Sequence, residues 1–133
     1  MKYAWNRALF SLGKSVALIC LLVASQPLFA ASADRELVYN EVRTLLQNGQ
    51  ADQAFKILLK KEVLWSGGDS FDYLFGVAAL DSGQPGEAVF SLQRLVSRKP
   101  DFAGARMELA RAYFELGDNE LARKEFQRIL SEN

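Results

Sequence analysis

The chain has 133 residues, enough for one domain, and its 16 basic residues balance 16 acidic ones. It contains no histidine and one cysteine, so the commonest general base and the soft ligands of a metal centre are almost missing from the sequence. The charge balance argues against nucleic acid as a partner, because nucleic-acid binding requires a clearly basic surface. We therefore expect a protein that is not an enzyme and that has no cofactor and no metal site.

The N-terminal segment, positions 1–33, is arranged like a secretory signal peptide. Basic residues come first, the apolar stretch 16–24 follows, and small residues then offer cleavage after Ala30 or after Ala33. We expect residues 1–33 to direct export across the inner membrane, and residues 34–133 to form a periplasmic domain. The domain would have an excess of acidic over basic residues, because the leader contains Lys2, Arg7 and Lys14 but no acidic residue.

The alternative is that the N-terminus stays uncut and anchors the chain in the inner membrane. The apolar run at 16–24 is shorter than the ~20 residues needed to span a bilayer, which favours cleavage. Contact with the membrane is expected only if the N-terminus is uncleaved. Cleavage would also remove Cys20, so the domain would rely on packing without a disulfide.

Six helices are predicted after this segment from the spacing of apolar residues. Their approximate ranges are 35–48, 52–64, 70–82, 85–98, 102–116 and 119–131. Residues 31–35 are a plausible linker. Asp69 or Ser70 is a candidate N-cap of the third helix, and Asp101 is one for the fifth. The turns between the helices are short, which predicts antiparallel packing of neighbours.

An internal repeat with a constant period runs through the chain. The positions that recur are Gly49, Gly83 and Gly117, then Ala54, Ala88 and Ala122, then Leu58, Leu92 and Phe126. This spacing, about 34 residues, predicts helix–turn–helix units. The units lie at about 35–68, 69–102 and 103–133. Each glycine is expected to end a helix in the left-handed conformation.

The pattern of large and small residues in these units resembles the tetratricopeptide repeat family. The residues that match are Phe75, Gly76, Ala79, Ala88, Leu92, Leu95 and Pro100 in the second unit, and Leu109, Ala110, Tyr113, Ala122, Phe126 and Ile129 in the third. The family's first-helix tryptophan is missing, and Asp72 and Arg106 stand in its place. The resemblance implies an all-α fold, a right-handed α-solenoid of about three repeats.

A narrower resemblance covers residues 88–130. This stretch looks like the periplasmic repeat domain that precedes a β-barrel in surface lipoprotein assembly modulators and related outer-membrane proteins. In that family the chain continues to a further helix and the barrel, whereas this sequence ends at Asn133. It is therefore expected to be either a small stand-alone adaptor or the truncated N-terminal part of such a protein.

The same resemblance implies a partner-binding groove lined by the first helices of the repeats. The positions assigned to it are Tyr39, Asn40, Arg43, Tyr73, Leu74, Val77, Met107, Glu108 and Arg111. Tyrosine and arginine are enriched in protein hot spots, and methionine adapts to varied partners. Leu74, Val77 and Met107 fit the core between repeats equally well. Asp69 and Asp72 are interpreted as charges that stabilise the start of the third helix.

The function that combines these features is a periplasmic module that binds a protein or peptide partner in the cell envelope, in outer-membrane assembly or export. A second hypothesis is a scaffold that is anchored in the inner membrane or associates with itself. In that case the uncapped C-terminal helix would provide the contact between copies.

Overall fold

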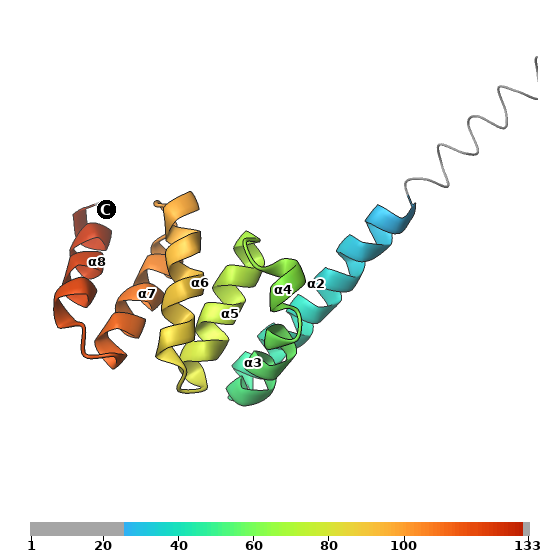
Figure 1. The fold of residues 1–133 in the computed structure, drawn as a ribbon, viewed down its shortest axis with the longest axis horizontal. Coiled ribbons are helices and arrows are strands. Elements are labelled where there is room, and N and C mark those ends of the chain that lie inside the picture. Colours follow the sequence, from blue (N-terminus) through green and yellow to red (C-terminus); the bar gives the residue numbers. More distant parts are fainter. Residues whose placement is uncertain (1–25, 132–133) are drawn as a thin grey trace, which may run out of the picture. The chain divides into compact units, whose positions relative to one another are not determined.

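The computed structural model describes residues 26–131, and within this range it consists of seven helices without a strand. The helices are α2 (Gln26–Gln47), α3 (Ala51–Leu59), α4 (Glu62–Trp65), α5 (Asp69–Asp81), α6 (Pro85–Arg98), α7 (Ala103–Glu115) and α8 (Asn119–Ser131) (Figure 1). The prediction of an all-α fold built from successive helix pairs is confirmed. None of the described helices is long and apolar enough to cross a membrane.

The chain divides into two compact units, residues 1–37 and 38–133. In the first unit the described part is the beginning of α2, where residues 32–37 are exposed. The predicted signal peptide lies outside the described residues up to position 25. The prediction of a linker at 31–35 is wrong, because α2 runs through these residues without a break.

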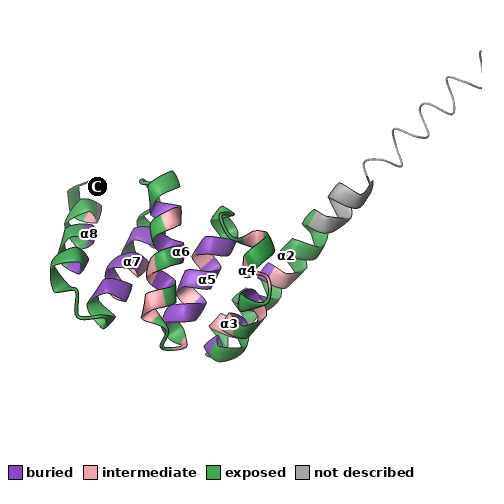
Figure 2. Ribbon diagram, in the orientation of Figure 1, coloured by how far each residue is buried: buried purple, intermediate pink, exposed green. Residues whose placement is uncertain are grey.

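In the second unit the helices follow one another as neighbours. Helix α3 packs beside α5, α5 beside α6, α6 beside α7 and α7 beside α8, and the last four helices are joined by short turns (Figure 1). Buried residues are concentrated in α5, α6 and α7 (Figure 2). They form two apolar clusters, one around Phe71 and Phe75 and the other around Leu92 and Leu95.

The glycines of the repeat end their helices as predicted. Gly49, Gly83 and Gly117 have φ angles of 72°, 74° and 83°, in the left-handed region that side chains with a Cβ resist. After α5, the N–H of Gly83 donates to the Leu80 carbonyl at 2.9 Å, and the next N–H donates to the Ala79 carbonyl at 2.7 Å. The same pair of bonds closes α2 and α7, so one Schellman motif recurs in every repeat.

Close packing of α5 on α6 depends on Gly76, a glycine inside a helix and not at its end. A Cβ at Gly76 would lie 2.5 Å from Cγ of the fully buried Leu92, well inside van der Waals contact. Ala110, the counterpart of Gly76 in the next repeat, and the alanines at the small second-helix position, Ala88 and Ala122, are also buried. Small residues therefore set the spacing between helices, as the repeat pattern predicts.

The predicted second helix is two helices in the structure. Helix α3 ends at Leu59, a tight turn with a bond from Lys61 N–H to the Leu58 carbonyl follows, and α4 begins at Glu62. Lys61 is the counterpart of the buried Leu95 in the next repeat, so an unbroken helix would direct a charged group into the core. Instead its Nζ lies 5.4 Å from the centre of the Trp65 ring.

The predicted N-caps are corrected by the structure. Helix α5 has Gly68 at its N-cap and α7 has Phe102, and neither start is capped by a side chain. Asp69 is the first residue of α5, and Asp101 contributes its backbone carbonyl, which accepts from the N–H of Ala103. The turn before α7 is therefore tied by a backbone bond, whereas in the turn before α5 the N–H of Gly67 donates to the Asp72 carboxylate.

Candidate protein-binding surface

One face of α2, α5 and α7 carries the same three positions in each helix. Residues four apart lie on one side of a helix, and each helix presents a stripe at i, i+4 and i+8. The stripes are Tyr39, Arg43 and Gln47 in α2, then Tyr73, Val77 and Asp81 in α5, then Met107, Arg111 and Glu115 in α7. Helices α5 and α7 contact each other directly, so two of these stripes lie side by side. We refer to the surface of the three stripes as the inner face.

A hollow of about 320 Å³ opens on the inner face between α2, α5 and the turn before α7. It is lined by Arg43, Asp69, Ser70, Tyr73, Leu74 and Phe102. The rings of Tyr73 and Phe102 pack together with their centres 5.1 Å apart. A second hollow, of about 420 Å³, adjoins it through Asp69 and Phe102 and also meets Lys99. The two aromatic rings therefore stand at the centre of a recess with charged groups around its rim.

The end of the inner face formed by the last turns of α5 and α7 is acidic. Arg111 contacts three carboxylates there: it forms an ion pair with Asp81, lies 3.0 Å from Glu108 without hydrogen-bond alignment, and lies 3.5 Å from Glu115. One positive charge thus stands against three negative ones. Asp81 and Glu115 are also the last residues of their helices, where the helix dipole disfavours an anion. We refer to these four residues as the acidic end.

The pKa values of Tyr73, on the inner face, and of Glu108, at the acidic end, are raised above their ordinary values. Burial raises the pKa of Tyr73, and the nearby charge of Glu108 raises it further while Arg111 lowers it. Burial also raises the pKa of Glu108, with Arg111 opposing the shift and with Asp81 and Glu115 adding to it. The carboxylates of the acidic end therefore repel one another, and Arg111 relieves only part of that repulsion.

The structure separates the nine predicted groove residues by exposure. Asn40, Arg43 and Met107 are exposed, and Asn40 Oδ1 accepts from Arg43 Nη1 at 2.8 Å. The half-buried ones are Tyr73, Val77, Glu108 and Arg111.

Tyr39 and Leu74 are buried, and the Tyr39 ring meets Trp65 edge to face at 5.6 Å. Both side chains pack in the core, yet Leu74 also lines the first hollow, so the assignment of these two residues to the groove stays a prediction.

The residues of this surface that are missing from the predicted groove include Phe102, Asp81 and Glu115. The prediction does not include Phe102, because this residue lies in the turn before α7 and not in a helix. Phe102 is exposed, and an aromatic residue directly before a helix is a signal from which a binding position can be identified. Asp81 and Glu115 stand at the same place in successive repeats, so the repeat itself relates them. An acidic residue at the C-terminal end of a helix opposes the helix dipole. Its recurrence at the ends of α5 and α7 is a signal from which the acidic end can be identified.

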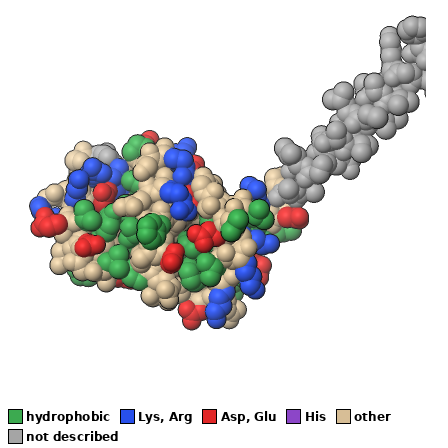
Figure 3. Space-filling view, viewed as in Figure 1, with side chains coloured by type: hydrophobic (Ala, Val, Ile, Leu, Met, Phe, Trp, Pro, Cys, Tyr) green, Lys and Arg blue, Asp and Glu red, His purple; other side chains and the backbone are tan. Residues whose placement is uncertain are grey.

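On the face seen in Figure 3, hydrophobic side chains gather in several patches, with acidic and basic side chains between them. Among residues 26–131, no group of three or more His, Cys, Asp or Glu side chains could hold a metal ion. The accessible chemistry of this surface is therefore that of aromatic rings, carboxylates and guanidinium groups.

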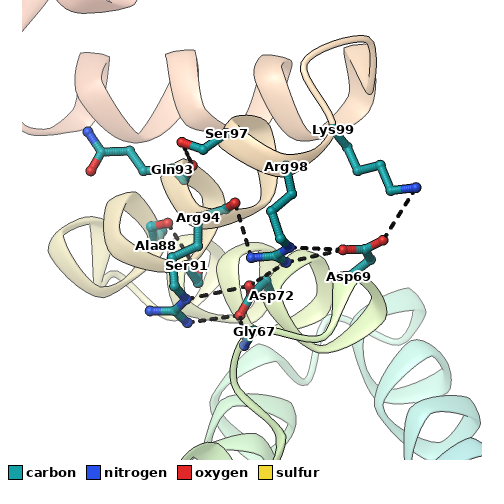
Figure 4. A network of polar contacts seen from close by, with 10 residues as sticks. All are labelled: Gly67, Asp69, Asp72, Ala88, Ser91, Gln93, Arg94, Ser97, Arg98 and Lys99. Carbon is teal, nitrogen blue, oxygen red and sulfur yellow. Dashed lines mark hydrogen bonds and ion pairs between the residues drawn. The ribbon is translucent and has the colours of Figure 1, made fainter.

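An ion network centred on the buried Asp72 holds α5 to α6 (Figure 4). Asp72 is fully buried, and its carboxylate accepts from Arg94 Nη2 at 2.8 Å, from Arg98 Nη2 at 2.9 Å and from the N–H of Gly67 at 3.1 Å. Asp69 joins at the exposed edge and pairs with Arg98 at 3.1 Å. Asp72 lies in the first turn of α5 and accepts from the N–H of Gly67 just before it, as expected for a charge at the helix start. Its two arginine partners in the next helix are the part that the interpretation did not include.

The next repeat has a buried ion pair at the corresponding place. Arg106 in α7 donates from Nη1 to Glu125 Oε2 in α8 at 2.7 Å, and its Nη2 donates to the Pro100 carbonyl. Both side chains are nearly inaccessible to solvent. Each of the last two repeats therefore fastens its own two helices with a buried salt bridge where the family pattern has an aromatic residue.

Comparisons with known proteins agree with this architecture. Residues 79–133 match the model of the tetratricopeptide repeat family. Surface lipoprotein assembly modifier 1 of Neisseria meningitidis serogroup B is 38% identical over 61 residues, 46% of this chain, and the chain spans 12% of that protein's length. The solved structure titled "MamA RS-1 ArsTM double mutant" superposes with a TM-score of 0.67 at 17% identity, over 95% of this chain and 68% of the other. This second likeness concerns the fold alone.

Proposed function

We propose that this chain, a tetratricopeptide repeat protein, is a non-enzymatic module that holds an extended segment of a partner protein against its inner face. Helical repeats of this kind build extended surfaces that other proteins bind. The observation that carries the proposal is the recess at Tyr73 and Phe102, where two packed aromatic rings line a hollow of about 320 Å³. Aromatic side chains beside a concave, partly apolar surface are typical anchors of protein recognition.

The charges around the recess suggest the chemistry of the bound segment. An apolar side chain of the partner would occupy the hollow between Arg43 and Phe102. A lysine or arginine further along the segment would then reach the acidic end, where Arg111 leaves two of three negative charges uncompensated. Such a cation would favour the charged form of Glu108, whose pKa is raised first by burial and further by Asp81 and Glu115.

We place this module in the periplasm, in the assembly or export of outer-membrane components. Two observations support that location. Positions 1–33 have the order of regions that a signal peptide has. The matching stretch of the Neisseria protein belongs to a surface lipoprotein assembly modifier, as its name states.

The location is tested by the intact mass of the chain recovered from the periplasmic fraction of a bacterial host. A mass that lacks the segment up to Ala30 or up to Ala33 is expected. A full-length mass in the membrane fraction would contradict it and would favour the anchored scaffold.

The binding site is tested with peptides selected from a random library against the purified chain. Each selected peptide is titrated into the ¹⁵N-labelled protein, and the amide signals that shift are mapped. We expect the largest shifts at Tyr73, Val77, Phe102 and Arg111, which belong to the inner face and its recess. Shifts confined to α3 and α4 would place binding elsewhere and contradict the proposal.

A further inference from the structure

A second surface, which shares no residue with the inner face, lies where the second helix of the first repeat ends. Val63 and Leu64 are 94% and 76% exposed there, on the short helix α4. Leu59, the last residue of α3, is 47% exposed. Two neighbouring lysines, Lys56 and Lys60, are exposed as well. We refer to these five residues as the α3–α4 surface.

The internal repeat shows that this exposure does not come from an end of the chain. Ser97 stands one repeat after Val63, and it is exposed although one helix pair precedes it and another follows it. Arg98, one repeat after Leu64, is exposed too. In the third repeat Ser131 takes the place of Val63, and it is also exposed. These positions therefore face water in successive repeats, and the first repeat has apolar side chains there.

The order of polar and apolar residues is reversed at this end of the helix. Residues 61–64 are Lys-Glu-Val-Leu, whereas residues 95–98, one repeat later, are Leu-Val-Ser-Arg. Leu95 and Val96 are buried in the core, where a lysine and a glutamate would lose their hydration. In the first repeat the apolar pair comes two positions later, and it lies on the outside.

The charged side chains around this apolar pair are mainly positive. Residues 53–68 contain three lysines, Lys56, Lys60 and Lys61, against one acidic residue, Glu62, although the charges of the whole chain balance. The Nζ of Lys61 lies 5.4 Å from the centre of the Trp65 ring. Exposed aliphatic side chains with lysines and a tryptophan beside them are typical of segments that lie in the interface of a membrane.

We propose that the α3–α4 surface docks the repeat domain on a bilayer that contains anionic lipids. Val63 and Leu64 enter the boundary between headgroups and acyl chains, while the lysines stay at the level of the phosphates. The contact belongs to the domain itself, so it does not require the uncleaved N-terminus from which membrane contact was expected. It goes beyond the proposed function and does not rest on it, because the inner face contributes no residue.

A protein partner fits this surface less well. Interfaces between proteins are enriched in arginine and depleted in lysine, and the α3–α4 surface contains two lysines and no arginine. A second copy of the chain, packed through the same surface, would bring its own lysines against these. An anionic bilayer matches both the positive charge and the apolar pair, and it needs no complementary pocket.

The test uses the full chain with the substitution Trp5→Phe, which leaves Trp65 as its single tryptophan. Because Trp65 directly follows Leu64, its fluorescence reports lipid contact at this surface and not at the N-terminus. The vesicles consist of phosphatidylcholine alone or of phosphatidylcholine mixed with phosphatidylglycerol, and brominated acyl chains serve as the quencher. We expect vesicles with phosphatidylglycerol to quench Trp65 and to bind the chain more tightly than vesicles of phosphatidylcholine alone.

The apolar contribution is tested with a double variant. Val63→Ser combined with Leu64→Ser should weaken binding to the anionic vesicles at least about tenfold, since two apolar side chains no longer enter the lipid. Phe90→Ser is the matched control, because Phe90 is 66% exposed on α6 and lies outside this surface. It should leave the affinity unchanged.

The electrostatic contribution gives an independent arm of the test. Lys56→Gln and Lys60→Gln should each weaken binding about fivefold, the effect of one basic residue near an anionic surface. Lys124→Gln should have no effect, because the exposed Lys124 occupies the position of Lys56 in the third repeat. Added salt should weaken binding of the parent protein. Far-UV circular dichroism and thermal melting of each variant show that the fold is retained.

Several results would overturn the proposal. Trp65 is not quenched by the anionic vesicles, or the chain binds both kinds of vesicle equally well, or the double variant at Val63 and Leu64 binds like Phe90→Ser. Binding without quenching of Trp65 would assign the contact to the N-terminus. A dimer that the double variant dissociates in analytical ultracentrifugation would mean that a second copy covers the surface. Tyr73→Ala should leave vesicle binding unchanged, so a failure of the inner face as a partner site is distinguishable from a failure of this proposal.

Discussion

Asp72 and Arg106 occupy the same position in consecutive repeats, and both are buried with an oppositely charged partner on the following helix. Asp72 meets two arginines of α6, and Arg106 meets Glu125 of α8. The sign of the buried charge is thus reversed between neighbouring repeats. A helix that paired with the wrong partner would bury two like charges, so this reversal disfavours mispairing of the helices.

Removing the Asp72 carboxylate should strongly destabilise the fold. Asp72→Ala leaves the N–H of Gly67 and the Arg94 guanidinium without their acceptor, while Arg98 keeps Asp69. We expect the change to lower the free energy of unfolding by about 3 kcal/mol. Asp69→Ala, in the exposed part of the same network, should cost at most about 1 kcal/mol. Urea denaturation measures both. Equal losses would show that burial does not determine the contribution of this network.

The salt bridge in the last repeat should behave differently when one or both partners are removed. Glu125→Ala leaves the buried guanidinium of Arg106 without its carboxylate and should cost about 3 kcal/mol. The double variant Arg106→Leu/Glu125→Leu removes both charges, and it should recover most of that loss. Thermal and urea denaturation of the two proteins provide the comparison. A double variant less stable than the single one would contradict this account.

Two glycines provide a matched test of helix spacing. Gly76→Ala places a Cβ 2.5 Å from Leu92 and should destabilise the chain by about 1–3 kcal/mol. Gly86→Ala, in the first turn of α6, meets no atom within 4 Å and should stabilise it by up to about 1 kcal/mol. The free energy of unfolding in urea distinguishes them. Two substitutions that change stability in the same direction would show that Gly76 does not set the spacing.

Glu108 should make stability depend on pH. Burial and the neighbouring carboxylates raise its folded-state pKa, so the folded chain binds more protons than the unfolded chain in the window above the ordinary glutamate value. This contribution to stability is therefore lost as pH rises above the ordinary glutamate pKa. Glu108→Gln should gain stability relative to the parent protein as pH increases. A difference that is constant with pH would contradict the assignment.

The repeat and its turns can be predicted from the sequence because their causes are local. Gly83 adopts the left-handed backbone conformation because glycine has no Cβ, and Pro85 starts α6 as expected. Helices α5, α6 and α8 accordingly begin and end close to their predicted limits. The break at Lys61 follows from tertiary packing, because only the position of the core determines that a lysine must turn away there.

The candidate site is predicted less completely, since its contacts join distant residues. Tyr73 and Phe102 meet across a helix and two turns, and neither residue alone indicates the other. From the sequence, Asp72 could be related only to the start of its own helix. The arginines that bind it lie in α6, far along the chain, so the pairing could not be predicted. Spacing within a helix identifies a shared face, whereas the partner across the interface depends on how two helices pack.

The most direct test of the inner face compares two aromatic positions. Peptides selected from a random library against the purified chain are titrated into Tyr73→Ala, on the inner face, and into Phe90→Ala, an exposed residue of α6. We predict that Tyr73→Ala weakens their binding at least about tenfold, as truncation of an interface anchor does, and that Phe90→Ala leaves it unchanged. Binding that survives Tyr73→Ala, or that falls equally in both variants, would contradict the assignment of the partner site to the inner face.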